Sequence, residues 1–309
     1  MATTHNYWNL KNEHIKNLLV ISLTMVLVVL ALISSRILVS ALASIGPVIS
    51  GGNLTEAFKL ALDRALESQL WLNLSEFIRC VLCLFIVYIF IKRFNKETFS
   101  WAKVGFNFKP KSILLFIVGM AIYCLTFFSS FFLSSFWGII RPPATWIQTL
   151  FQLNTGQFFI LVFTQNFFNA LWQEVIFRAH LQTRLIKVYG AMWGILLTSI
   201  IFVLLHGFIR PMSVMEILTG IVIFSFVGFL FHKSKSIFLI TGIHGTGNFL
   251  LTIFVGANIP LPRYLDRLLA FGIMFMVAYI LLKRTRGIER TISSHIPNIK
   301  YKNHLTKSL

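Results

Sequence analysis

Apolar runs of about 20 residues dominate the chain and recur eight times between short polar segments. As α-helices, such runs are long enough to cross the roughly 30 Å hydrocarbon core of a bilayer. They cover approximately residues 17–41, 72–92, 112–136, 158–183, 190–208, 213–232, 236–256 and 266–283. The pattern predicts an all-α protein, a polytopic transmembrane helix bundle of about eight spans.

Composition supports a membrane protein, because 56% of the residues are hydrophobic and only 12% are charged. A net charge of +18 would suggest a nucleic-acid partner in a soluble protein. Here Lys and Arg gather between the spans, above all in 92–111 and from 283 onward, as in polytopic proteins. We therefore predict a lipid bilayer around the chain, no nucleic-acid partner, both termini in the cytoplasm, and a bacterial plasma membrane as location.

Three regions are predicted along the chain. Residues 1–110 hold two spans, an interfacial helix and a basic cytoplasmic loop, 111–258 form a core with the polar residues, and 259–309 hold the last span and a basic cytoplasmic tail. The interfacial helix is predicted for 55–71, where apolar residues recur at helical spacing. Thr55 is its expected N-cap, with Glu56 in the first turn.

Charged residues inside the spans indicate functional positions, because ionisable groups in hydrocarbon are costly and rare. Glu76 and Arg79 are three residues apart on one predicted helix, so they can neutralise each other as a structural pair. Glu174 and Arg178, four apart in the fourth run, allow the same interpretation.

Two histidines are predicted to lie at about the depth of Glu174. The turn between the fourth and fifth runs falls near 189–190, so Glu174, 15 residues before it, and His206, 16 after it, reach similar depths in a helical hairpin. His244 lies nine residues into the seventh run from Lys235, which predicts a similar layer again. Asn248 shares a helix face with His244, and nearby glycines permit close helix approach.

Two chemistries fit such a layer. A buried carboxylate can act as general base on a water molecule, while a histidine or asparagine stabilises the oxyanion formed at a carbonyl. One carboxylate and two histidines could instead hold zinc with an open position for water. We expect no cofactor and leave zinc as the alternative.

These residues resemble the motifs of the CPBP (CAAX protease and bacteriocin-processing, or Abi) family, E-E-x-x-x-R, F-x-x-x-H and H-x-x-x-N on successive helices. The corresponding segments are 173–178, 202–206 and 244–248, within a resemblance of roughly 110–258. The resemblance implies a membrane-embedded glutamic endopeptidase that opens toward the cytoplasm and needs no metal. The implied partner is a membrane-associated peptide or protein substrate, as in CAAX processing or in peptide maturation and immunity.

Gln173 departs from that family pattern, which has a glutamate, usually assigned as the base, at this position. A glutamine orients water but has no carboxylate to take its proton. Three interpretations stay open: Glu174 has become the base, the protein is catalytically inactive, or Gln173 is an engineered replacement.

The sequence therefore predicts catalytic roles for Glu174, His206, His244 and Asn248, and supporting roles for Gln173 and Arg178. The alternative function is a non-catalytic regulatory, binding or immunity protein of the membrane. A transporter is less favoured, since the sequence shows no repeated halves. Substrate identity, a need for prenylation and the oligomeric state stay open.

Overall fold

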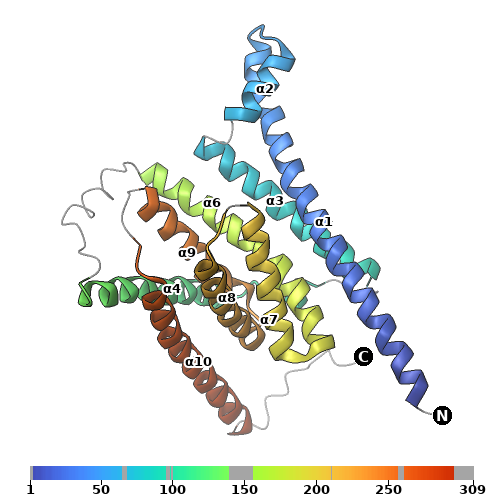
Figure 1. Ribbon diagram of the computed structural model, residues 1–309, viewed down its shortest axis with the longest axis vertical. Helices are drawn as coiled ribbons and strands as arrows, with labels where there is room; N and C mark the ends of the chain where they lie inside the picture. Colours follow the sequence, from blue (N-terminus) through green and yellow to red (C-terminus); the bar gives the residue numbers. More distant parts are fainter. Residues whose placement is uncertain are drawn as a thin grey trace.

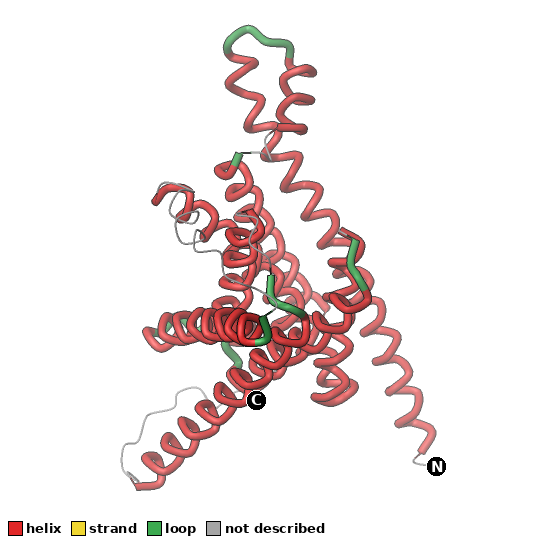
Figure 2. The backbone as a smooth tube through the Cα atoms, turned by 60° about the vertical axis from the view of Figure 1, so that its left-hand side comes forward, coloured by secondary structure: helices red, strands yellow, loops and turns green. Residues whose placement is uncertain are grey.

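The computed structural model describes residues 3–64, 68–94, 98, 100–138, 156–209, 211–256 and 261–295. Helices account for nearly all of this part of the chain, and none of it forms a strand (Figure 2). The prediction of an all-α bundle is confirmed. The expected basic tail from 296 onward lies outside the described residues.

Within the described residues, nine α-helices and three shorter helical segments follow one another, with labels as in Figure 1. They are α1 (Thr3–Ile49), α2 (Leu54–Arg64), α3 (Gln69–Ile89), the π turn η2 (Phe90–Phe94), the 3-10 turn η3 (Trp101–Val104), α4 (Pro110–Phe136), α6 (Gly156–Glu174), the π-helix η4 (Val175–Gln182), α7 (Thr183–Ile209), α8 (Val214–Ser234), α9 (Ile237–Gly256) and α10 (Tyr264–His295).

Six helical stretches within the described residues are long and apolar enough to cross a membrane. One of them, Ile160–Gly207, contains two of the expected spans joined by a turn, and the predicted last span lies in α10, whose side chains are described only to residue 280. The number of spans and the side on which the termini lie stay predictions.

The chain reverses at Gly190, where the backbone is non-helical with φ 78°. Positions nearly equidistant from this glycine meet across the hairpin. The Phe177 and Phe202 rings are 4.9 Å apart, and a Cβ atom on Gly194 would overlap Ile186. Glycine adopts positive φ without a Cβ clash, which explains why the predicted turn falls here.

The interfacial helix differs from its prediction. α2 begins at Leu54, and the Oδ1 atom of Asn53 accepts hydrogen bonds from the backbone N–H groups of Thr55 and Glu56. The N-cap is therefore Asn53 rather than Thr55, because the Asn53 side chain, two residues earlier, accepts from the free N–H groups of the first turn. Residues 69–71 belong to α3, and α2 lies at the far end of α1 from the N-terminus (Figure 1).

α9 is the central helix of the bundle. Of the residues in its most apolar stretch, 67% are buried, compared with 22–44% in the other five candidate spans. It packs against α4 and α6, and a Cβ atom on Gly242 would collide with the Phe116 carbonyl oxygen. Small residues let helix backbones approach closely in a membrane protein, so the expected role of the glycines near His244 is confirmed at this contact.

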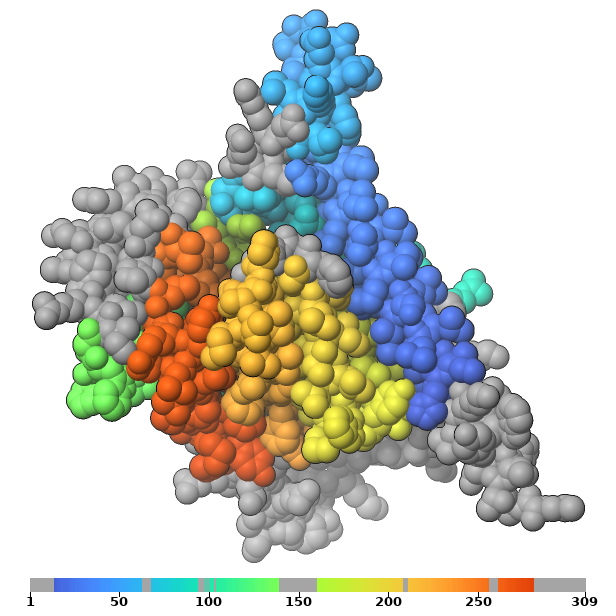
Figure 3. All heavy atoms as spheres, in the orientation of Figure 1, coloured from blue at the N-terminus to red at the C-terminus, as the bar shows by residue number. Residues whose placement is uncertain are grey.

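The remaining helices form the outer wall. On the face shown in Figure 3, α1, α7, α8 and α10 make much of the surface. Many large apolar side chains on these helices are exposed, for example Leu19, Met276 and Leu218. Such a surface suits lipid and would be a liability in water.

Candidate functional site

Glu174 and His244 meet inside the bundle. The Nδ1 atom of His244 lies 2.7 Å from the Oε1 atom of Glu174, and the carboxylate's other oxygen accepts a hydrogen bond from Arg178 Nε at 3.2 Å. Glu174 and Arg178 are both 0% exposed and His244 is 6% exposed. The expectation that Glu174 and His244 reach the same depth, and that Glu174 pairs with Arg178, agrees with these contacts. The chemical roles of the three residues stay predictions.

Arg178 is a buried cation whose charge is balanced locally. Besides its ion pair with Glu174, its guanidinium lies 3.4 Å from Gln182 Oε1 and 5.7 Å from the centre of the Phe202 ring. Gln182 in turn donates to the carbonyl oxygen of Gly228. These contacts hold Arg178 against the Glu174 carboxylate, so Arg178 orients that group rather than facing a substrate.

A π-helix lies directly after Glu174, over Val175–Gln182. Single π turns inside helices occur often at functional sites, because they redirect side chains relative to a regular α-helix. Every side chain of this segment is buried. The change of helical geometry sets how Glu174 and the Arg178 side chain lie relative to α7 and α9.

Gln173 is 6% exposed and faces a different neighbour from Glu174. Its Nε2 atom donates to Asn169 Oδ1 at 2.5 Å, while its Oε1 atom is buried with no hydrogen-bond partner among the described residues. Adjacent helical positions point about 100° apart, which explains why Glu174 reaches His244 and Gln173 does not.

His206 lies one aromatic ring away from His244. The Phe202 ring is 4.5 Å from the His206 ring and 5.7 Å from the His244 ring, and His206 Nδ1 lies 2.8 Å from the Phe202 carbonyl oxygen. The Phe202 ring therefore neighbours both imidazoles, and His206 lies close to the Glu174–His244 pair.

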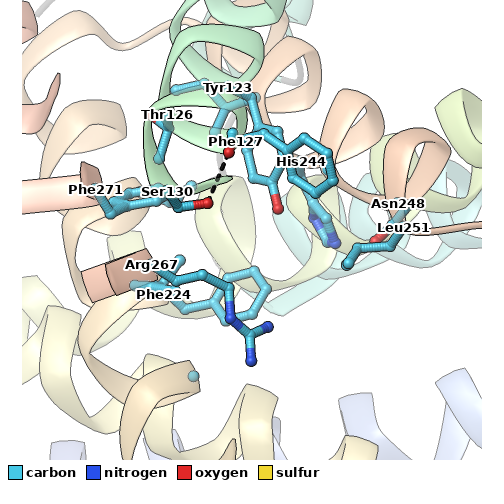
Figure 4. A pocket seen from close by; sticks show the side chains of 15 residues that line it. Tyr123, Thr126, Phe127, Ser130, Phe224, His244, Asn248, Leu251, Arg267 and Phe271 are labelled. Carbon is cyan, nitrogen blue, oxygen red and sulfur yellow. Dashed lines mark hydrogen bonds between the residues drawn. The ribbon is translucent and has the colours of Figure 1, made fainter. Parts of the chain in front are cut away.

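Asn248 borders a cavity of about 150 Å³ together with His244 (Figure 4). Aromatic and aliphatic side chains form most of its wall, and Arg267 of α10 also borders it. The Nε atom of Arg267 is buried without a hydrogen-bond partner within the described chain. His244 of the buried pair therefore borders a largely apolar space.

Sequence reasoning missed several residues of this region. Asn169 and Gln182 are polar residues four positions from Gln173 and Arg178, and this helical spacing was the available signal. Arg267 and Tyr123, which border the cavity, carried no such signal because they come from other helices. Among the described residues, no three His, Cys, Asp or Glu side chains gather in a group that could hold a metal ion.

Fold and site together define a multi-pass integral membrane protein with a glutamate–histidine pair buried among its helices. Residues 155–250 match the family model described as "Type II CAAX prenyl endopeptidase Rce1-like", and this segment contains all three motifs. The match confirms the resemblance over this segment, which is similar to that family of CAAX prenyl endopeptidases. No curated protein and no solved structure matched the chain.

Proposed function

We propose that the chain is an endopeptidase that hydrolyses a peptide bond of a membrane-associated protein or peptide, with Glu174 acting through His244. The observation that carries the proposal is the 2.7 Å hydrogen bond between the two side chains. It resembles the carboxylate–imidazole pairs that activate water or hydroxyl groups in hydrolases.

The protonation of His244 follows from its partner. A carboxylate only accepts hydrogen bonds, and one Glu174 oxygen accepts from Arg178. His244 therefore carries its proton on Nδ1 and has a lone pair on Nε2. Both Glu174 oxygens already have partners and the residue is fully buried, which favours His244 Nε2 over Glu174 as the atom that meets water.

The proposed hydrolysis has two steps. His244 Nε2 takes a proton from water as the water oxygen adds to the peptide carbonyl carbon, and the Asn248 amide donates a hydrogen bond to the resulting oxyanion. The same proton passes from His244 to the peptide nitrogen as the C–N bond breaks. We assign His206 to the same polar layer. Because its Nδ1–H donates to the Phe202 carbonyl oxygen, it can donate to the developing charge through Nε2 only as an imidazolium.

The cavity supports an apolar substrate segment. Its wall is largely aromatic and aliphatic, with Arg267 as the charged side chain. Substrates that place an apolar residue and an anionic group there fit best. CAAX-type processing, as in the matched family's description, and peptide maturation both supply such membrane-associated peptides.

One observation favours a second candidate, a catalytically impaired family member that binds peptides or acts in regulation or immunity. Gln173 stands where the family pattern has a glutamate, and its side-chain oxygen cannot take up a proton at neutral pH.

Cleavage of a membrane-anchored peptide library by the purified protein in lipid distinguishes an active peptidase from a catalytically impaired family member. Turnover that is lost in His244→Ala and kept in Gln173→Glu supports the Glu174–His244 peptidase. Turnover by Gln173→Glu alone would support the impaired member, and the peptides retained by the unaltered protein would then be identified.

A further inference from the structure

Tyr123 of α4 brings a phenol to the cavity that His244 and Asn248 border. The centre of its ring lies 6.3 Å from that of Phe127 on the same helix and 6.4 Å from that of Phe271 on α10. Its hydroxyl points into the cavity, on the side where His244 lies (Figure 4). The hydrolysis proposed above gives this hydroxyl no role.

The position of the phenol depends on a glycine of α9. A Cβ atom on Gly247 would lie 2.8 Å from the Cε2 and Cζ atoms of Tyr123 and 3.2 Å from its hydroxyl oxygen. Non-bonded carbon atoms stay about 3.5–4.0 Å apart, so the phenol fits there only because residue 247 has no side chain. Residues three and four apart are neighbours on a helix surface, so Gly247 and Asn248 both lie beside His244. The Tyr123 hydroxyl is therefore held within one helical turn of both polar residues.

Three of the described residues that border the cavity carry a hydroxyl group, and all three belong to α4. Thr126 donates to the carbonyl oxygen of Ile122 at 2.7 Å, and Ser130 donates to that of Phe127 at 2.6 Å. Both protons are thus used inside the helix. Tyr123 donates no hydrogen bond to another described residue, so its proton can reach a group bound in the cavity.

The proposed hydrolysis lacks a second neutral donor for the oxyanion. Oxyanions at carbonyl carbons are stabilised by preorganised donors, and active sites commonly supply more than one. Asn248 is proposed to supply one N–H group, and His206 can donate only as an imidazolium. A phenol donates in its neutral form, and the packing of the Tyr123 ring orients it before substrate binds.

We propose that Tyr123 is a catalytic residue: together with the Asn248 amide, its hydroxyl donates a hydrogen bond to the oxyanion formed when water adds to the peptide carbonyl. This role rests on the proposed peptidase function. The phenol keeps its proton throughout, because the proton from water passes to His244 and then to the leaving nitrogen. Gly247 is a positioning residue, since its missing side chain leaves room for the Tyr123 ring.

The first measurement compares Tyr123→Phe with Tyr279→Phe in the cleavage of one membrane-anchored peptide by the full chain in lipid. Each substitution removes only a hydroxyl group, and Tyr279 of α10 packs against Phe229 instead. Tyr123→Phe should lower kcat about 10²-fold with little change in KM or unfolding temperature, as expected for loss of one oxyanion donor. Tyr279→Phe should leave kcat unchanged. A loss confined to KM, or equal effects of the two substitutions, would overturn the inference.

The second measurement tests the hydrogen bond to the oxyanion directly. In the same peptide, a difluoromethylene ketone replaces the scissile bond, because its hydrate imitates the tetrahedral intermediate. Tyr123→Phe should weaken inhibition by this ketone by about the factor by which it lowers kcat/KM. Inhibition by a methylene isostere, which lacks the carbonyl oxygen, should stay the same. Equal weakening of both inhibitors would show that Tyr123 only shapes the cavity, which contradicts a donor role.

Gly247 provides a third test. Gly247→Ala should lower kcat by displacing the Tyr123 ring, and Gly245→Ala is its matched control, because the nearest atom to that added Cβ is 3.5 Å away. Since Gly247 is proposed to act through the Tyr123 hydroxyl, adding Gly247→Ala to Tyr123→Phe should cost little further kcat. Additive losses would overturn the positioning role.

Failure of the donor role and failure of the proposed function give different results. Turnover that is lost in His244→Ala and kept in Tyr123→Phe would overturn the role of Tyr123 and leave the peptidase in place. If only the Gln173→Glu form cuts, the same variants are compared in that form. If neither form cuts any peptide, the proposed function and the donor role are both wrong.

Discussion

His244 Nδ1 lies 2.7 Å from Glu174 Oε1, although the two residues are 70 positions apart in the chain. The contact joins α9, the most buried candidate span, to the end of α6. Glu174 has a second partner in Arg178, so one carboxylate balances a buried cation and holds an imidazole at the same time. Loss of the ion pair with Arg178 should therefore change stability, and loss of the contact with His244 should change activity.

Removing the Glu174 carboxylate should lower both stability and peptidase activity. We expect Glu174→Ala to lower the free energy of unfolding by roughly 3–5 kcal/mol, because Arg178 is left as an unpaired buried charge. Peptidase activity should fall by about 10²–10⁴-fold. Thermal unfolding in lipid and peptide cleavage measure the two effects.

The double variant Glu174→Leu/Arg178→Met is the control for stability. It replaces both charges with apolar groups, which should restore much of the stability, whereas activity should stay lost. If the double variant regained activity together with stability, Glu174 would be a structural residue only.

Asn248→Ala should lower kcat about 10²-fold with little change in KM or unfolding temperature, because the Asn248 amide is proposed to donate only to the oxyanion. Leu251→Ala, on the same cavity wall, should instead raise KM, since it removes apolar contact with the bound segment. Steady-state kinetics on one peptide distinguish the two patterns. Equal KM effects in both variants would remove Asn248 from the chemistry.

Much of the architecture could be predicted from the sequence, because each span has its own apolar run. The turn near 189–190 and the common layer of Glu174 and His244 followed from helix rise alone. Helix rise gives depth along one axis, and it says nothing of which helices are neighbours. For that reason Asn169, Arg267 and the hydrogen bond from Trp172 to the Glu76 carboxylate were missed.

Local backbone geometry was a second feature that could not be predicted from the sequence. The π-helix over Val175–Gln182 lies inside the predicted span 158–183, and the hydrophobic pattern gave no sign of a change in helix type there. The N-cap of α2 was predicted at Thr55 and lies at Asn53. Both residue types cap helices, and the choice between them depends on where the backbone turns.

The α4–α9 contact should tolerate no side chain at Gly242. We expect Gly242→Val to destabilise the protein by roughly 1–3 kcal/mol or more, because its Cβ would overlap the Phe116 carbonyl oxygen. Gly272→Ala on α10 is the control, since no atom lies within 4 Å of its added Cβ. Unfolding temperatures in lipid test this, and equal shifts in the two variants would contradict close packing at Gly242.

Arg267 should select substrates by charge. Its guanidinium borders the cavity beside His244, its Nε atom has no hydrogen-bond partner within the described residues, and the low-dielectric wall strengthens its attraction for an anion. Arg267→Met should therefore raise KM about tenfold for peptides with an anionic group in the cavity segment and leave neutral analogues unchanged. Arg263→Gln serves as the matched control, because Arg263 lies one turn away and pairs with Asp266 instead. If Arg267→Met weakened binding of anionic and neutral peptides equally, Arg267 would contribute to the shape of the cavity and not to charge selection. The proposal that the substrate carries an anionic group would then be wrong.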